Sequence, residues 1–576
     1  MKKTIALFLC ICMLAAVFAG CQTSATTAAP TSAATTAASA ATTTPTTTEK
    51  TVENFNPTGF PIVNTPIKLS YLTVNWSNYT ADDYANDEWI KEIEAKTGIL
   101  LEPTAIPSTD ASSKRNVMLA SGNYPEIIAA SFSRAEIIQF GVQDHILVDL
   151  KSAIDTYGDE LKKVFDYNDV YYKGLISPDG AIYGLPSIDE GYHTQAYPKM
   201  YIRQDWLDKL NLSMPTDTES FRAMLQAFVS NDLNGDGKKD EIGLTGNTES
   251  CTPIQWCLIG QAFTTCRPGL WLYQDKTSKA ITFAPAQESY RNGLKYVKSL
   301  YDEGLLDPAA FTNKNSQMQV TIRTEPYSVG AFICDHPAMG VDSNNYNEYK
   351  NYQVLSVPLK GPDGFQEQPS NNGFGEVGSF NIAVTDKCEN VEAAVRLFDY
   401  FMSEEQTMLN WLGKKGRNWE EVDASSNLKN ILGGSVKYQK LTGYESSGTD
   451  KPAPYHTLSV CYFKSLEINN SAMAAVDDVY QPQYYEQRIM LDTVSLKDYR
   501  RDTYLPKNIF IPTKDNSSFS TIQTNLNDFI EKTAVQFILG ERNLDTDWEA
   551  YLKELQNYGV DKYVSIYTEA YNTMNQ

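Results

Sequence analysis

The chain has 576 residues and a formal net charge of −22, from 49 Lys plus Arg against 71 Asp plus Glu. At about 150 residues per domain, this length predicts two to four domains or one large two-lobed body. A hydrophobic content of 42%, with 35 Tyr and 8 Trp, is enough to build substantial cores. The acidic balance excludes nucleic acid as a partner, because phosphate binding needs clustered Lys and Arg, and it disfavours electrostatic attachment to anionic lipid.

Residues 1–20 predict a secretory signal. Two lysines give a positive start, an almost wholly apolar run follows, and the small residues Ala19 and Gly20 precede Cys21. The apolar run is shorter than the ~20 residues that a transmembrane helix needs. The segment resembles a bacterial lipoprotein signal, although Phe18 departs from that pattern, and simple secretion is the alternative. The resemblance implies that Cys21 is lipidated and holds the protein on the outer face of a membrane.

Residues 21–60 are expected to form a tether between this anchor and the folded body, residues 61–576. No charged residue occurs from Gln22 to Thr48, and nearly every residue there is Ala, Thr, Ser or Pro. Such a segment has no large apolar side chains to offset the entropy cost of ordering, so we expect it to be flexible.

Six cysteines remain once Cys10, Cys12 and Cys21 are assigned to the leader and the anchor. An even number outside the cell permits disulfides, whereas the lack of a CxxC pair among them disfavours a zinc site. In a body of this size, buried free thiols fit the sequence as well as bridges do. Whether these six form disulfides or remain free thiols therefore stays open; they are Cys251, Cys257, Cys266, Cys334, Cys388 and Cys461.

The first half of the expected body alternates strands and helices. Strands are predicted at 67–74, 99–101 and 127–130, with helices at 87–97 and 113–120 between them. This rhythm predicts a parallel, doubly wound sheet, in which ligands approach the carboxyl ends of the strands.

A second unit begins near Met200, with a strand at 201–203 and a helix from Asp205. Thr216 and Glu219 have the spacing of a capping box. The helix that they open has a core-facing stripe of Phe221, Met224, Leu225 and Phe228. Further helices are predicted at 391–402, 529–539 and 548–558.

Residues 232–241, DLNGDGKKDE, predict a structural calcium loop. Oxygen-bearing side chains alternate around Gly237, which permits a sharp turn, and such ligands suit a hard cation. An EF-hand has a bidentate Glu at its twelfth position, where this chain has Gly243. A solvated acidic turn is the alternative, because Asn, Asp and Gly are ordinary turn formers. The expected ligands are Asp232, Asn234, Asp236, the Lys238 carbonyl, Asp240 and, as substitute for the missing Glu, Glu241.

Motifs in a fixed order from about Ile67 to Met574 resemble the extracellular solute-binding lipoproteins of ABC importers, in the subgroup for oligosaccharide uptake. They are ANDEWIKEIEAKTGI (85–99), LASGNYPEII (119–128), IYGLP (182–186), YIRQDWLDKLNL (201–212), the calcium loop, FDYFMSEEQ (398–406) and FILGERNLDTDWEAYLKELQNYGV (537–560). The resemblance implies an α/β, two-lobed periplasmic-binding-protein-like fold, with hinge strands and a ligand cleft between the lobes. It also implies calcium in a loop of this kind, as in related alginate-type binding proteins, a monomer, and delivery of the solute to the permease subunits of an ABC transporter. We expect lobe 1 to hold residues 66–187 and 325–385, and lobe 2 to hold 188–324 and 386–576.

An oligosaccharide site needs aromatic rings that stack on sugar faces, beside polar groups that bind hydroxyls. The candidates lie at predicted strand ends, just after the chain first crosses from lobe 1 to lobe 2, or in Gly-rich turns. They are Asn75, Trp76, Ser131, Tyr192, His193, Arg203, Asp335, Glu376 and Trp419. Each has a structural alternative: Trp76 could cap a core, for example, and Arg203 could pair with an acid near the hinge.

Three other functions are considered. A surface glycosidase needs two suitably spaced carboxylates, for which Asp335 and Glu376 are the only pair that suggests itself, and the chain has no HExxH, GxSxG or P-loop motif. A passive adhesin would not explain the two-lobed α/β pattern. Peptide or other small-solute binding on the same fold remains the main alternative, so the sequence predicts a non-enzymatic capture protein.

Overall fold

The computed structural model describes residues 54–76, 79–249, 253–370, 376–423, 425–441, 458–501 and 504–575. The expected leader, Cys21 and the tether up to residue 53 lie outside these ranges. None of the helices within them is long and apolar enough to cross a bilayer. The described body contains two four-stranded sheets, each with its own hydrophobic core.

The first sheet has the strand order β11–β3–β1–β2. β1 (Ile67–Asn75) pairs in parallel with β2 (Ile99–Pro107) and with β3 (Ile127–Ala129), while β11 (Ala383–Val384) runs antiparallel to β3. Helices α2 (Glu88–Thr97) and α3 (Ala111–Ser121) lie between these strands in the sequence. The predicted strands and helices and the parallel pairing of β1 with β2 and β3 are confirmed here, whereas β11 makes the edge of the sheet antiparallel.

Helix α2 shows how local sequence sets an element. The Asp87 side chain accepts the N–H groups of Trp89 and Ile90, which satisfies two of the free donors at the helix start. Gly98 ends the helix in the left-handed conformation, with φ of 77°, as its position after the apolar stripe predicted. The helix buries Trp89, Ile90 and Ile93 against the first sheet.

The second sheet has the order β10–β5–β9–β6 and is mixed rather than parallel. β5 (Lys199–Arg203) runs antiparallel to β9 (Val329–Cys334) and to β10 (Tyr352–Val354), whereas β6 (Ile242–Thr245) is parallel to β9. The parallel, doubly wound pattern predicted for the first half of the body does not extend to this sheet. Long helical connections separate its strands in the sequence, and they let the chain enter β9 in the direction opposite to β5.

Helix α9 (Thr218–Ser230) begins one residue later than the predicted capping box. The cap is Asp217, whose carboxylate accepts the Ser220 N–H at 2.7 Å. Thr216 cannot serve, because its carbonyl accepts the Lys360 N–H at 3.0 Å and holds that residue outside the helix. The predicted stripe of Phe221, Met224, Leu225 and Phe228 is buried, as expected.

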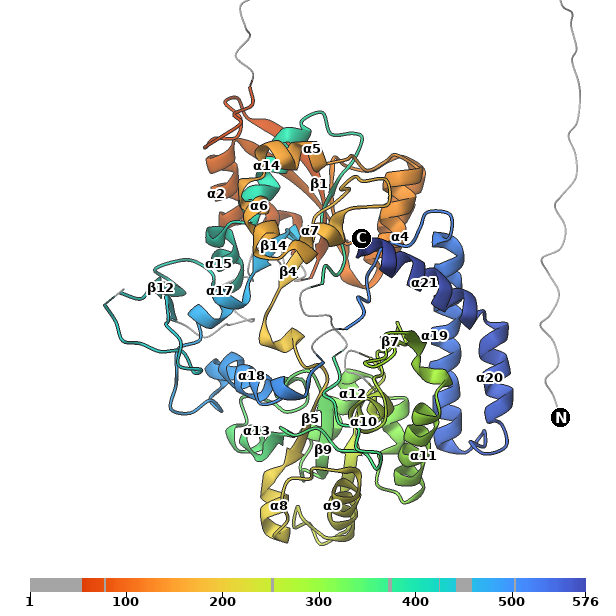
Figure 1. Ribbon diagram of the computed structural model, residues 1–576. Helices are drawn as coiled ribbons and strands as arrows, with labels where there is room; N and C mark the ends of the chain where they lie inside the picture. Colours follow the sequence, from red (N-terminus) through yellow and green to blue (C-terminus); the bar gives the residue numbers. More distant parts are fainter. Residues whose placement is uncertain are drawn as a thin grey trace, which may run out of the picture. The chain divides into compact units, whose positions relative to one another are not determined.

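The two cores differ from the expected lobe ranges. β9 and β10 fall in the range 325–385 assigned to lobe 1, but they pair with strands of the second sheet. Helix α14 (Val391–Phe401) was assigned to lobe 2, but it packs on α5 (Lys151–Tyr157) in the first core. Strand pairing and helix packing between remote segments set these placements, and sequence ranges alone do not show them. The second core also takes in α10 (Ile254–Ala262), α11 (Glu288–Asp302), α19 (Asn516–Leu539), α20 (Trp548–Asn557) and α21 (Val560–Met574) (Figure 1).

The remaining helices are short and cover the sheets or their connections. They include α1 (Ala81–Asn86), α4 (Arg134–Ile137), α6 (Asp159–Tyr167), α7 (Asp169–Leu175), α8 (Gln204–Leu210), α12 (Asn315–Arg323) and α13 (Tyr346–Asn351). Asp399 on α14 accepts the Leu161 N–H at 2.9 Å and so caps α6 from a distant part of the chain.

Five cysteines of the body are described, and all five are buried free thiols. They are Cys257, Cys266, Cys334, Cys388 and Cys461, while Cys251 lies outside the described residues. For these five, the structure favours the free-thiol alternative over bridges.

Candidate functional site

A cavity of about 400 Å³ lies beside the segment that joins the two sheets. Its walls come from β4 (Ser187–Asp189), the short helix η3 (Tyr192–Thr194), α15 (Glu404–Leu412), β14 (Tyr462–Lys464), α17 (Leu466–Ser471) and α18 (Tyr485–Val494). We call it the η3 cavity. Its lining residues are Asp189, Tyr192, His193, His336, Thr407, Asn410, Trp411, Tyr462, Lys464, Asn469, Met473, Tyr485, Glu486 and Ile489.

An ion pair forms one wall of the η3 cavity. β4 and β14 pair in parallel with Asp189 opposite Lys464, and the Lys464 Nζ lies 2.9 Å from the Asp189 Oδ2. Burial alone would raise the pKa of Asp189, but the Lys464 ammonium, with His193 and the Gly191 N–H, outweighs it and lowers this pKa below its ordinary value. The pair therefore places a fixed carboxylate and its counter-ion side by side at neutral pH.

Two imidazoles face the same space. His193 is open to cavity solvent although protein surrounds it, and His336 is partly buried. Desolvation lowers the pKa of both rings, so each is neutral at pH 7 and offers one donor and one acceptor nitrogen. The His336 Nδ1 is buried and has no hydrogen-bond partner among the described residues.

A buried amide adds a second polar atom of this kind. Asn410 on α15 is only 8% exposed, and its Oδ1 has no partner among the described residues. A buried polar atom without a partner costs about 1–3 kcal/mol, so the protein side chains alone leave the lining of the η3 cavity incompletely hydrogen-bonded.

Aromatic rings complete the lining. Trp411 and Tyr485 both donate to the Glu486 Oε1, at 3.3 and 3.1 Å, which fixes their orientation. The Lys464 Nζ lies 4.8 Å from the centre of the Trp411 ring. Tyr192 is buried, and its hydroxyl donates to Asn470 at 2.6 Å. Rings with fixed orientation beside carboxylates, amides and imidazoles can stack on and hydrogen-bond a polyhydroxylated ligand.

Of the predicted ligand residues, the structure brings Tyr192 and His193 into the η3 cavity and Asp335 to its edge. The Asp335 carboxylate accepts the backbone N–H of His336 at 2.8 Å, and its carbonyl accepts the Lys199 ammonium at 3.0 Å. Asp335, which is remote in sequence from Tyr192 and His193, is therefore bonded to a residue that lines the same cavity, His336.

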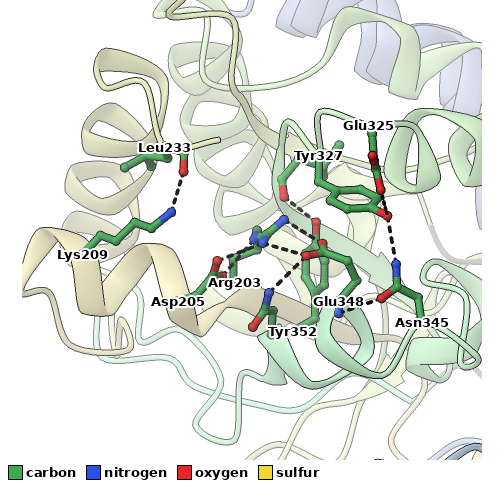
Figure 2. A network of polar contacts seen from close by, with 11 residues as sticks. Arg203, Asp205, Lys209, Leu233, Glu325, Tyr327, Asn345, Glu348 and Tyr352 are labelled. Atoms are coloured by element: carbon green, nitrogen blue, oxygen red, sulfur yellow. Dashed lines mark hydrogen bonds and ion pairs between the residues drawn. The ribbon is translucent and has the colours of Figure 1, made fainter. Parts of the chain in front are cut away.

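Arg203 lies elsewhere, in a polar network that joins β5, α8 and α13. Figure 2 shows its guanidinium between the carboxylates of Asp205 and Glu348. Its Nε and Nη2 donate to Asp205 and its Nη1 to Glu348, each at 2.9 Å, and Nη2 also reaches Glu348 at 3.2 Å. Nearby, Asn345 donates to the Tyr327 hydroxyl at 2.9 Å. This arrangement matches the alternative interpretation, in which Arg203 pairs with acids.

The other candidates do not line the η3 cavity. Trp419 is buried against Tyr438, with ring centres 5.4 Å apart. Asn75 hydrogen-bonds the backbone of residue 79, and Ser131 is exposed with a φ of 44°. Trp76 is 52% exposed and donates to Ser459 at 3.3 Å, so it does not cap a core.

Glu376 lies beside a second cavity, of about 620 Å³, lined in part by Gln255, Trp256, Lys507 and Glu531. Its Oε2 accepts the Lys507 N–H at 2.9 Å, and its Oε1 is 3.7 Å from Arg267. Gln255 is buried, and its Oε1 has no partner among the described residues. This second cavity thus competes with the η3 cavity as a binding site.

Sequence reasoning missed five important residues of the η3 cavity: His336, Asn410, Trp411, Lys464 and Glu486. The run Tyr462–Lys464 has three residues and no flanking turn signal, so its pairing with β4 is not readable. Trp411 ends an amphipathic helix and looks like a core residue from its spacing alone. His336 comes two residues after the end of β9, next to Asp335, so the strand-end argument that selected Asp335 could have found it.

The loop at 232–241 is turned as predicted, but its oxygens already have partners. Asp232 accepts the N–H groups of Gly235 and Gly237, at 2.7 and 2.9 Å, and both glycines have positive φ. Asp236 accepts the Lys238 N–H, and Asp240 is exposed. Within the described part of the chain, no three His, Cys, Asp or Glu side chains form a group that could hold a metal ion.

Glu241 is the exception in that loop. It is 5% exposed, its Oε1 accepts the N–H groups of Leu233 and Asn234, and its Oε2 has no partner among the described residues. The side chain of Asn234 likewise has a buried amide nitrogen without a partner there. The donor set fits a hard cation at its Glu241 end, where a carboxylate oxygen is left free.

Comparisons with known proteins agree with this architecture. Residues 88–417, more than half of the chain, match the family described as bacterial extracellular solute-binding protein. The fructooligosaccharide ABC transporter substrate-binding protein FusA of Streptococcus pneumoniae serotype 4 is 26% identical over 499 residues, which cover 84% of this chain and 86% of FusA. The polygalacturonan/rhamnogalacturonan-binding protein YtcQ of Bacillus subtilis is 23% identical over 369 residues, covering 62% and 68%.

Solved structures match over most of the chain. An extracellular solute-binding protein from Bifidobacterium longum subsp. infantis has a TM-score of 0.72 at 18% identity, covering 89% of this chain and 99% of that one. FusA, solved as an EF-hand mutant in complex with fructo-nystose, has a TM-score of 0.67 at 23% identity, covering 88% and 99%. These likenesses establish the fold.

Proposed function

The chain belongs to the bacterial extracellular solute-binding protein family, and from this premise we propose that it captures an oligosaccharide in the η3 cavity and delivers it to an ABC permease. It is a solute-binding protein of an ABC transporter and not an enzyme. FusA and YtcQ bind oligosaccharides or polysaccharides, which supports a sugar over a peptide. The two relatives differ in the charge of the sugar, so they leave that property open.

The observation that carries the proposal is that two lining side chains, from different cores, each hold a polar atom without a partner among the described residues. The His336 Nδ1 and the Asn410 Oδ1 are both buried in the lining, together with the rings of Trp411 and Tyr485. Sugar hydroxyls both donate and accept, so one ligand can satisfy a ring nitrogen and an amide oxygen at once. Stacking on the rings would supply the apolar contribution.

Delivery requires that the loaded protein differ from the empty one. We propose that the ligand favours a closed arrangement of the two lobes that the free protein already samples. A ligand can shift that equilibrium only by its differential affinity for the closed form. Small-angle scattering should then show compaction with saturating ligand, and an unchanged radius of gyration would count against closure.

The anchor and the calcium site are part of the proposal. Lipidation at Cys21 would keep the protein on the extracellular face of the membrane, near its permease. A structural calcium ion would be held by Glu241, Asp232, Asn234 and Asp236, after the two aspartates give up their turn hydrogen bonds. When bound, the ion would neutralise this acidic loop and fix its conformation.

Calorimetry with a ligand panel tests the proposed function. With calcium present, neutral and acidic oligosaccharides, monosaccharides and short peptides are screened by thermal shift, and hits are titrated. We expect saturable binding of an oligosaccharide that is recovered intact. Release of a shorter product would place the protein among enzymes, and a peptide as the tightest ligand would overturn the sugar assignment.

Two matched variants test the place of binding. Asn410→Ala removes a buried amide from the η3 cavity, and Gln255→Ala removes one from the second cavity. Loss of one hydrogen bond to the ligand should weaken binding about three- to tenfold. We expect this loss for Asn410→Ala and a change within about twofold for Gln255→Ala. The reverse result would move the ligand to the second cavity.

A further inference from the structure

The ionisable groups that line the η3 cavity carry one net negative charge. The carboxylates of Asp189 and Glu486 face the single ammonium of Lys464, and the imidazoles of His193 and His336 are neutral. Among the described lining residues, Lys464 is the only lysine or arginine. The phenol of Tyr192 stays protonated, because burial raises its pKa.

The one cation of the lining is already committed. Lys464 lies 2.9 Å from Asp189 and 4.8 Å from the Trp411 ring centre, and its side chain is 9% exposed. Drawing its charge to a ligand would leave the Asp189 carboxylate unpaired. Lys199 is buried, does not line the cavity, and donates to the carbonyls of Gln195 and Asp335, at 3.1 and 3.0 Å. Neither ammonium is available to a carboxylate of the ligand.

The Glu486 carboxylate, in contrast, has only neutral partners. Trp411 donates its indole N–H and Tyr485 its hydroxyl to the same Oε1. Lys464, the one lysine among the described lining residues, forms its ion pair with Asp189 and not with Glu486. Its charge is therefore oriented but not neutralised, and it acts on whatever occupies the cavity.

We infer that the η3 cavity selects uncharged oligosaccharides and rejects those built of uronic acids. The inference rests on the proposed function, because it concerns the ligand of the same cavity. A uronate would place its carboxylate near Glu486 without a free cation to pair with, and it would lose solvation on entry. Neutral hydroxyls can instead donate to Glu486 and accept from the histidine rings. We expect a uronic acid to bind at least tenfold more weakly than its uncharged counterpart, which corresponds to about 1.4 kcal/mol.

A panel of sugars that are matched in structure but differ in charge tests this inference. The purified chain is titrated with neutral fructo-, gluco-, galacto-, manno- and xylo-oligosaccharides, with oligogalacturonates, and with alginate oligomers. The tightest sugar is then compared with the derivative whose primary alcohol is a carboxylate, or, for a uronate, with its methyl ester. An uncharged tightest ligand that loses at least tenfold on gaining a carboxylate supports the inference.

The opposite outcomes are distinct. A uronate that binds as tightly as its ester, or more tightly, overturns the selection of uncharged sugars and leaves the oligosaccharide function standing. If no sugar binds and a peptide does, the proposed function itself fails, and the inference fails with it.

Two variants test which carboxylate causes the discrimination between acidic and neutral sugars. Glu486→Gln keeps an oxygen to accept from Trp411 and Tyr485 but removes the charge. We expect the ratio of acid to neutral affinity to move at least threefold toward the acid, whatever happens to either affinity alone. Glu531→Gln removes a carboxylate from the second cavity and should leave that ratio unchanged. A shift with Glu531→Gln and none with Glu486→Gln would overturn the assignment to the η3 cavity.

Discussion

Replacing Lys464 by Met should expose how much the β4–β14 ion pair contributes to the native state. The substitution keeps an unbranched apolar stem, one atom shorter, but removes the ammonium 2.9 Å from Asp189. Both partners are largely buried, with 9% and 19% of the side chains exposed. Breaking a buried pair from one side leaves an uncompensated charge, which typically costs about 3–5 kcal/mol.

The structure places the expected cost near the lower end, at about 3 kcal/mol. Asp189 would keep the Gly191 N–H, which donates to its Oδ1 at 2.7 Å, and it would keep contact with cavity solvent. The loss of the Lys464 contact with the Trp411 ring adds a smaller amount, about 0.5–1 kcal/mol. The double variant Asp189→Asn/Lys464→Met leaves no buried charge, so we expect it to be more stable than Lys464→Met alone.

The dependence on pH gives a second measure. The pKa of Asp189 is lowered in the folded state, so the contribution of the pair is present above the unfolded value near 4 and is lost as pH falls through the folded value. The difference between wild type and Lys464→Met should therefore shrink as pH falls below about 4.

Urea titrations, followed by tryptophan fluorescence and circular dichroism, measure these differences. The control is Lys415→Met, which breaks an exposed pair with Glu421 and should cost less than about 1 kcal/mol. If Lys464→Met is no less stable than this control, or if the double variant loses the sum of the two single losses, the buried-pair argument is refuted.

Three further predictions concern the rest of the body. Gly98→Ala should lower the free energy of unfolding more than Gly122→Ala does. Both glycines have positive φ, but only at Gly98 would the new Cβ meet a backbone atom, the Val63 oxygen, at 2.6 Å. Equal losses in urea titrations would contradict this prediction. Burial raises the pKa of Asp399 from 3.8 to about 6, so its contribution to the unfolding free energy should fall by about 2 kcal/mol between pH 4 and pH 6, and Asp399→Asn should remove that fall. A variant with the same pH profile as wild type would contradict this prediction. Calcium at 100 times its dissociation constant should add about 2.7 kcal/mol to the free energy of unfolding. Chelation should therefore lower the melting temperature of the wild type, and lower that of Asp232→Asn much less. An unchanged melting temperature in a metal-free sample would contradict a structural role for calcium.

Sequence patterns predicted the first sheet well, because its signals are local. The apolar strands and the capped helix between them are each set by neighbours in the sequence, as Asp87 and Gly98 illustrate. The second sheet was predicted less well, because strand direction depends on long connections and not on composition. Nothing in the residues of β9 distinguishes a parallel partner of β6 from an antiparallel partner of β5.

The site could be predicted only where one segment carries several of its residues. Tyr192 and His193 were found because they follow the predicted crossover, whereas Lys464 and Trp411 reach the cavity through tertiary pairing. Arg203 shows why strand-end position is not enough. It was a candidate ligand residue because it ends a predicted strand, but its guanidinium is bound by Asp205 and by Glu348, which is remote in sequence. Strand-end position predicts exposure to a cleft, and it does not predict whether a side chain is already paired.

The origin of the cavity lining suggests why binding and lobe geometry should be linked. α15 packs on the first core through Leu409, while His336 follows β9 of the second sheet. Helix α18 is held to the second sheet by Arg488, which donates to the carbonyls of Tyr349 and Tyr352. A ligand that bonds both Asn410 and His336 therefore contacts elements of both cores. Both bonds form together only when the two cores are in the arrangement that brings Asn410 and His336 to the same ligand. A variant that removes one of these bonds should therefore reduce the ligand's preference for that arrangement by the free energy of the lost bond.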